Sequence, residues 1–228
     1  MRETLEYVLL GHWRPAAQAA ALFGLGLAVS LPLARLRVRA LEWLPIQALK
    51  LVLRLMGPRP GLARMTAVIW GFNATAIFIY MASGFQPLLP KVFALWTGMN
   101  IGLVLAASRR EGEDVLWGLE RPRDGWVPPT WVAAACGMLV VLLELPCFWY
   151  AIAMGVTLGR DVQAGEGYYL AALGVRGWAY ARLIVPALLV SAAAESVAIR
   201  AGLPLGDTNV QQSGGPETGE EQRVYHSQ

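Results

Sequence analysis

The stretch WVAAACGMLVVLLELPCFWYAIAMGVTL, residues 131–158, holds a single charged residue, Glu144. A transmembrane helix needs about 20 consecutive, mostly apolar residues, and this stretch exceeds that length. Hydrophobic residues make up 56% of the chain and charged residues only 15%, which is too apolar for an ordinary soluble domain. The stretch therefore predicts a helix that spans a membrane.

Four further stretches have the same character. Pro15–Ala34, Met65–Gly84 and Val92–Ser108 hold no charged residue, and Leu183–Ile199 holds only Glu195. The predicted fold class is all-α, a polytopic transmembrane helix bundle within a domain of residues 1–206. Its five spans are expected at about 15–34, 65–84, 88–108, 131–158 and 182–200. Residues 207–228 are polar, which is typical of a disordered tail.

Segment 36–56 differs from the spans because its polar residues gather on one side of a helix. At 100° per residue, Arg39, Glu42, Gln47, Lys50 and Arg54 share a sector, and Leu41, Leu44, Leu51 and Leu55 lie opposite. This pattern predicts an amphipathic helix in the membrane interface. The alternative is a sixth spanning helix, in which Lys50 and Arg54 would need partners or would have to reach the headgroups.

The basic residues give an orientation. Most Lys and Arg fall on the side that holds residues 35–64, 109–129 and the tail. Because basic loops favour the cytoplasmic face, we expect a multi-pass protein of the cell (inner or cytoplasmic) membrane, with the N-terminus outside and the C-terminus in the cytoplasm. The net charge of +3 then reflects contact with anionic lipid headgroups and does not favour nucleic acid as a partner.

Residues for catalysis or metal binding are sparse. The chain has only two histidines, His12 and His226, so it cannot form a His-rich zinc site. Cys136 and Cys147 stand too far apart on one helix to form a disulfide. The sequence has no phosphate-binding loop and no hydrolase motif. We therefore expect no enzyme, no metal and no cofactor, with His12 as a ligand of a pigment or haem iron left as an alternative.

Glycine pairs point to tight helix packing. Gly98 and Gly102 lie one turn apart in the third span, and Gly155 and Gly159 do so at the end of the fourth. Small residues at this spacing let two helix backbones approach closely in a membrane. These four glycines are therefore predicted at helix contacts.

Glu144 is the most unusual residue, because a carboxyl near the middle of a membrane costs a few kcal/mol. Pro146 follows it, frees the carbonyl of Leu142 and predicts a kinked or broken helix. Polar residues in other spans could partner the carboxyl: Asn73, Thr75, Thr97, Asn100 and Glu195. Two interpretations stay open, a carboxyl that fixes helix packing and a carboxyl on a substrate or proton pathway.

These motifs, in their order along residues 15–204, resemble the stage II sporulation protein M family of integral membrane proteins. The resemblance is carried by GFNATAIFIYMASGFQPLLPKVFALWTGMNIGLVLA (71–106), LLELPCFWYAIAMGVTLG (142–159) and LIVPALLVSAAAESVAIRAGLP (183–204). Family motifs fall on Asn73, on Gly98 and Gly102, on Glu144-Leu145-Pro146 with Gly155 and Gly159, and on Glu195. The chain departs from them at Thr97, where the family has Asn, and at Val140-Val141, where it has His-Gly.

The resemblance implies a membrane scaffold that recruits other proteins. We therefore expect a non-enzymatic scaffold or accessory subunit of a larger membrane protein complex, whose partners are the lipid bilayer and other membrane subunits. A permease-like subunit of a transporter that uses Glu144 is the alternative. A third reading, a small subunit of a pigment or electron-transfer complex, rests only on aromatic residues in the spans.

Overall fold

Helices account for nearly all of the described residues. The computed structural model describes residues 2–36, 39–111, 126–165 and 168–202, and these contain no strand. The elements are α1 (Arg2–Arg35), α2 (Arg39–Met56), α3 (Leu62–Ala82), the 3-10 turn η1 (Ser83–Phe85), α4 (Leu89–Glu111), α5 (Thr130–Gln163), α6 (Tyr169–Ala179), the π-helical turn η3 (Tyr180–Ile184) and α7 (Val185–Gly202). The predicted all-α fold class is confirmed. Residues 207–228 and most of the 109–129 connection lie outside the described residues.

Five of the helical segments are long and apolar enough to cross a membrane. They are Leu10–Arg35, Leu62–Phe85, Leu89–Ala106, Thr130–Gln163 and Tyr169–Gly202. The helix α2 is not among them, since four charged residues interrupt its sequence. The count of five agrees with the sequence, and the structure is compatible with a multi-pass membrane protein.

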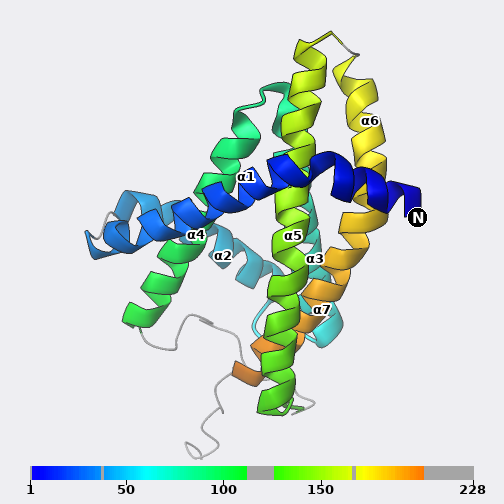
Figure 1. Cartoon of the computed structure of the whole chain (residues 1–228). Coiled ribbons are helices and arrows are strands. Elements are labelled where there is room, and N and C mark those ends of the chain that lie inside the picture. The colour runs from blue at the N-terminus through cyan, green and yellow to red at the C-terminus, as the bar shows by residue number, and fades with distance from the viewer. Residues whose placement is uncertain (1, 37–38, 112–125, 166–167, 203–228) are drawn as a thin grey trace, which may run out of the picture.

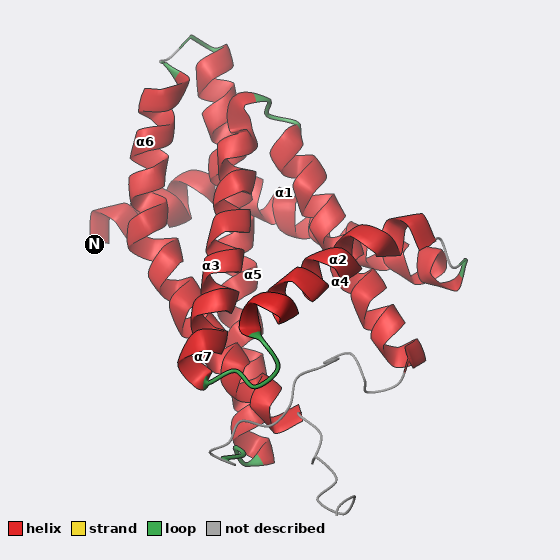
Figure 2. Ribbon diagram, turned by 180° about the vertical axis from the view of Figure 1, so that it is seen from behind, coloured by secondary structure: helices red, strands yellow, loops and turns green. Residues whose placement is uncertain are grey.

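The helices do not all run in one direction. Figures 1 and 2 show α3, α5 and the α6–α7 helix along the height of the molecule, while α1 runs across them. The α3–α4 and α5–α6 connections lie at the upper end, and the α2–α3 connection and the end of α7 lie at the lower end. The core forms where α5 meets α1, α3 and α7, and it includes Phe23, Met81, Phe148, Met154 and Leu188.

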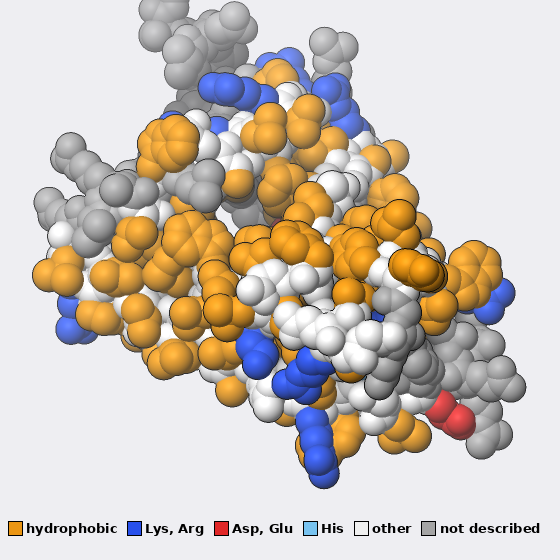
Figure 3. Space-filling model, turned by 90° about the horizontal axis from the view of Figure 1, so that it is seen from above, with side chains coloured by type: hydrophobic (Ala, Val, Ile, Leu, Met, Phe, Trp, Pro, Cys, Tyr) orange, Lys and Arg blue, Asp and Glu red, His pale blue; other side chains and the backbone are white. Residues whose placement is uncertain are grey.

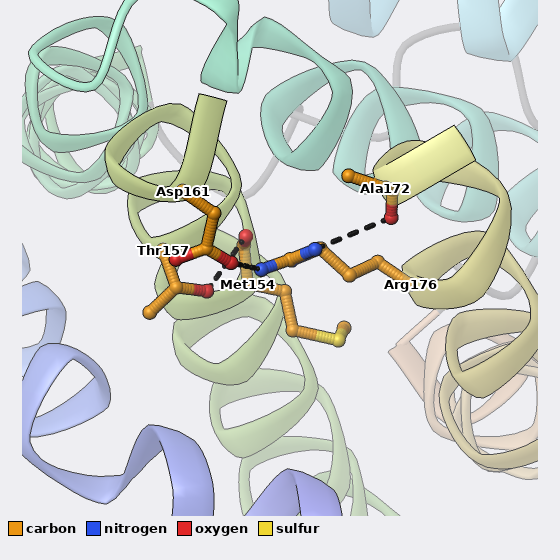
Figure 4. A network of polar contacts seen from close by, with 5 residues as sticks. All are labelled: Met154, Thr157, Asp161, Ala172 and Arg176. Carbon is orange, nitrogen blue, oxygen red and sulfur yellow. Dashed lines mark hydrogen bonds and ion pairs between the residues drawn. The ribbon is translucent and has the colours of Figure 1, made fainter. Parts of the chain in front are cut away.

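The last helix begins earlier than predicted, at Tyr169 rather than at residue 182. The structure places residues 169–181 in a helix that continues through η3 into α7, although Arg176 interrupts the apolar sequence here. The charge of Arg176 is accommodated because its guanidinium pairs with Asp161 of α5 (Figure 4). A tertiary partner has therefore overridden a local signal.

The π-helical turn η3 ends at Ile184, two residues before Pro186. Proline lacks an N–H and its ring presses on the preceding turn, and a wider turn relieves this clash. Two hydrogen bonds connect this turn to α3. Trp70 Nε1 of α3 donates to the carbonyl of Val185 at 3.1 Å, and the Tyr180 hydroxyl of η3 donates to the carbonyl of Ala74 in α3. Side chains of α3 and of η3 thus both stabilise the π-helical turn.

A charged cap ends α2. Gly57 has φ +80°, a left-handed conformation that favours glycine and stops the helix. The guanidinium of Arg64 donates to the carbonyl of Leu55 from Nε at 3.2 Å and from Nη2 at 2.9 Å. These bonds satisfy a carbonyl that the helix end leaves open and set the direction in which α3 departs.

The outer surface is strongly apolar. Figure 3 shows hydrophobic side chains over most of the upper face, with Lys and Arg in a few groups and Asp and Glu almost absent among the side chains drawn by type. On the helices, Trp131 is 74% exposed, Leu142 62% and Leu170 77%. Water-soluble monomers rarely expose contiguous apolar areas of this kind, so the surface fits contact with lipid or with other membrane helices.

The ion pair between α5 and α6 gives a first prediction. The Arg176 side chain is 7% exposed and that of Asp161 is 40% exposed, and Arg176 Nη1 also donates to the carbonyl of Ala172 at 3.3 Å. Replacing Asp161 by alanine leaves a buried guanidinium without its carboxylate. We expect Asp161→Ala to lower the free energy of unfolding by about 1–2 kcal/mol, less than a fully buried pair because Asp161 reaches solvent.

The measurement is unfolding of the purified protein by a denaturing detergent. Arg160→Ala is the matched control, because Arg160 is the exposed neighbour of Asp161, and it should change stability by less than about 0.5 kcal/mol. Equal effects of the two variants would show that the ion pair does not hold α6 against α5.

Candidate functional site

Glu144 lies in α5 and points between two other helices. Asn73 Nδ2 in α3 donates to Glu144 Oε1 at 3.2 Å, and Ser191 Oγ in α7 donates to Glu144 Oε2 at 3.4 Å. Each oxygen of the carboxyl therefore has one donor, and the three side chains connect α3, α5 and α7. A buried carboxyl with both oxygens bonded is a stabilising contact, whereas an unbonded one would be costly.

The helix α5 continues through Pro146 as a single helix from Thr130 to Gln163. The prediction was a kinked or a broken helix at this point: the break is wrong, and the kink stays a prediction. Proline removes one backbone hydrogen bond, and the packing of Phe148 and Ala151–Val156 in the core holds the helix on the far side of it.

The sequence analysis missed Ser191, the second partner of Glu144. A signal was present, because Ser191 stands four residues before Glu195 and so shares its face of the helix. Ser191 is 1% exposed. A serine on the same helix face as a carboxyl inside a predicted span is a sign of a polar contact that can be read from the sequence.

Among the described residues, the other predicted polar residues make no hydrogen bond to Glu144. Asn100 Oδ1, Thr97 Oγ1 and Glu195 Oε2 are buried, and none has a hydrogen-bond partner among the described residues. Thr75 is exposed on α3. The structure therefore divides the predicted set in two: Asn73 meets Glu144, while Asn100 and Glu195 belong to a different place.

That place is a cavity of about 400 Å³. It lies between α2, α3, α4 and α7, and Figure 2 shows α2 in front of α3 and α4 on this side. Most of its wall is apolar, and the polar side chains that line it are Asn73, Tyr80, Asn100 and Glu195. Asn73 thus contacts both places, since it lines the cavity and donates to Glu144.

The first glycine pair lies where α4 crosses α1. A Cβ added to Gly98 would fall on the carbonyl of Phe23, and one added to Gly102 would fall on the side chain of Ser30. Gly26 of α1 meets the carbonyl of Leu95 in the same way. The two backbones are close enough here that no side chain fits between them.

The second pair lies where α5 meets the end of α3. A Cβ on Gly155 would lie 2.8 Å from the carbonyl of Met81, and one on Gly159 would collide with the carbonyl of Gly84. Gly84 completes this contact, and sequence reasoning did not select it. Tyr169 of α6 also donates its hydroxyl to the carbonyl of Ala82 beside this contact.

The described residues offer little for metal or nucleophilic chemistry. Among them, no three His, Cys, Asp or Glu side chains group closely enough to hold a metal ion. His12 is buried in α1, and Cys136 and Cys147 are free thiols in α5. What the arrangement offers is one bonded carboxyl at a helix junction and one cavity with unpaired acceptors.

Comparisons with protein-family models, with curated proteins and with solved structures gave no match to this chain.

Proposed function

We propose that this protein is a non-enzymatic integral membrane scaffold or accessory subunit of a larger membrane protein complex. The observation that carries the proposal is the bonding of Glu144. Its oxygens accept from Asn73 and Ser191 at 3.2 and 3.4 Å, so the carboxyl joins three helices. A carboxyl used in this way supports helix packing rather than transport through Glu144.

The surface supports the same proposal. The first half of α5 is apolar and exposed, with Met138 61% and Leu142 62% exposed, while its second half forms the core. An apolar helix that projects from its own bundle exposes surface that can contact lipid or the helices of another subunit. The resemblance in motif order to the stage II sporulation protein M family also supports a scaffold role.

The helix α2 provides contact with the membrane surface. It packs on α3 and α4 through Pro45, Val52 and Met56, whereas Leu51 and Leu55 remain 50% and 51% exposed. An exposed apolar strip beside Arg54 and Lys50 suits an interface that contains anionic lipids. In the proposed orientation, α2 lies on the cytoplasmic side of the cell membrane, with the N-terminus outside.

The test is purification of the tagged native protein in a mild detergent, followed by mass spectrometry of the bound proteins. We expect defined membrane subunits in a fixed stoichiometry, and we expect Glu144→Gln to retain them. An amide can still accept at one oxygen and bond Ser191 through its nitrogen, so the helix junction survives. A chain that purifies alone, or partners lost from a folded Glu144→Gln variant, would contradict the scaffold role.

A permease-like membrane subunit of a transporter is the second candidate, and the unpaired oxygen of Glu195 favours it. Such an acceptor beside a cavity is the arrangement that a transported cation or proton uses. Flux measurements separate the two functions. Glu195→Gln should abolish substrate flux while leaving assembly intact if the chain is a permease, and should leave the function of the complex unchanged if it is a scaffold.

A further inference from the structure

The cavity between α2, α3, α4 and α7 has the size and lining of a small-molecule site. Its volume of about 400 Å³ falls in the range of ligand pockets, which are mostly apolar with a few placed polar groups. One face of α2 forms a continuous apolar wall: Pro45, Ala48, Leu49, Val52, Leu53 and Met56. This wall suits an apolar body of extended shape.

Two of the polar residues that line the cavity carry an acceptor without a donor. Glu195 Oε2 and Asn100 Oδ1 are buried and unpaired among the described residues, and both residues line the cavity. An unbonded buried acceptor is unfavourable, so two residues of one cavity wall that carry such acceptors favour a ligand that donates hydrogen bonds. The described residues that line the cavity include no Lys or Arg that could supply these donors.

The two carboxyl groups at and behind the cavity wall favour a positively charged group among the ligands that donate hydrogen bonds. Glu195 lines the cavity directly, and a second carboxyl, Glu144, lies behind Asn73, which is itself part of the wall. An ammonium group has three donors and no acceptor, and it is attracted by carboxyl groups in a region of low dielectric constant.

The mouth of the cavity opens on an apolar surface. Phe72, Ile101 and Leu105 line it and are 38%, 39% and 53% exposed. A molecule that enters past these side chains comes from the hydrocarbon of the bilayer in a chain whose helices span it. The ligand is therefore itself lipophilic.

From these observations we infer that the cavity binds a lipophilic amine, with its ammonium head at Glu195 and Asn100 and its apolar body along α2. The site needs no partner protein, so its test is independent of the test of the scaffold role.

The test uses the full chain in phosphatidylcholine nanodiscs and a photoreactive decylamine as the probe. We expect saturable labelling of peptides from 45–56 and 100–105. Unlabelled decylamine should compete at a concentration at least about tenfold lower than decanol or decanoate of the same chain length, because a hydrogen bond to a charged group is worth more than a neutral one. Labelling that is unsaturable, or equal competition by the alcohol, would overturn the site.

Two variants locate the head and the body of the probe. Glu195→Gln should weaken decylamine labelling at least about tenfold while leaving decanol competition unchanged, and Ala48→Phe should block the apolar wall. Glu6→Gln is the matched carboxyl control, since Glu6 is exposed on α1 and does not line the cavity. If Glu195→Gln and Glu6→Gln label alike, Glu195 does not hold the amine, and the inference is wrong.

Discussion

Gly98→Ala is expected to lower the free energy of unfolding by about 2–3 kcal/mol. The new methyl group would stand on the carbonyl of Phe23, which is backbone and cannot turn aside. The α1 and α4 helices must then separate along their whole contact, including the matching approach of Gly26 to Leu95. The measurement is the denaturant midpoint of the purified protein, with helix content followed by circular dichroism.

Gly71→Ala and Gly137→Ala are the matched controls. Both glycines lie inside helices, and a Cβ added to either meets no atom within 4 Å. Because alanine is the better helix former, these two variants should be neutral or more stable by up to about 1 kcal/mol. If Gly98→Ala behaves like them, the close crossing of α1 and α4 does not exist in the membrane.

The second large effect concerns Asn73 and Glu144. Asn73→Leu keeps the number and branching of the side-chain heavy atoms but removes the donor to Glu144 Oε1. We expect a loss of about 1–3 kcal/mol, because one oxygen of a buried carboxyl then has no partner. Glu144→Leu removes the acceptor as well, so Asn73→Leu should cost much less in that background.

The measurement is a double-mutant cycle with the two leucine substitutions, read from unfolding in denaturing detergent. A coupling free energy of about 1–2 kcal/mol is expected for this contact. Thr75→Val is the control on the same helix, where the threonine is exposed, and its effect should stay within about 0.5 kcal/mol. Additive effects of Asn73→Leu and Glu144→Leu would show that the bond does not connect α3 and α5.

Sequence reasoning identified four polar residues of the candidate site and missed how they are paired. It selected Asn73, Glu144, Asn100 and Glu195 because polar groups inside apolar helices are costly and are kept only with a partner or a function. It could not assign their partners. Which side chain faces which depends on the rotation of each helix, and a helix that is apolar all round has little amphipathic pattern from which to read that rotation. The bond of Ser191 to Glu144 and the cavity therefore appeared only in three dimensions.

The same distinction applies to the fold. Length, hydropathy and charge are local properties of the chain, and they predicted the all-α class, the five helices able to cross a bilayer and the separate character of segment 36–56. The folded chain was needed to see that residues 169–181 are helical, that Arg176 pairs with Asp161, and that α1 runs across the bundle. Buried charges and close backbone contacts depend on partners far away in the sequence, so no local pattern indicates them.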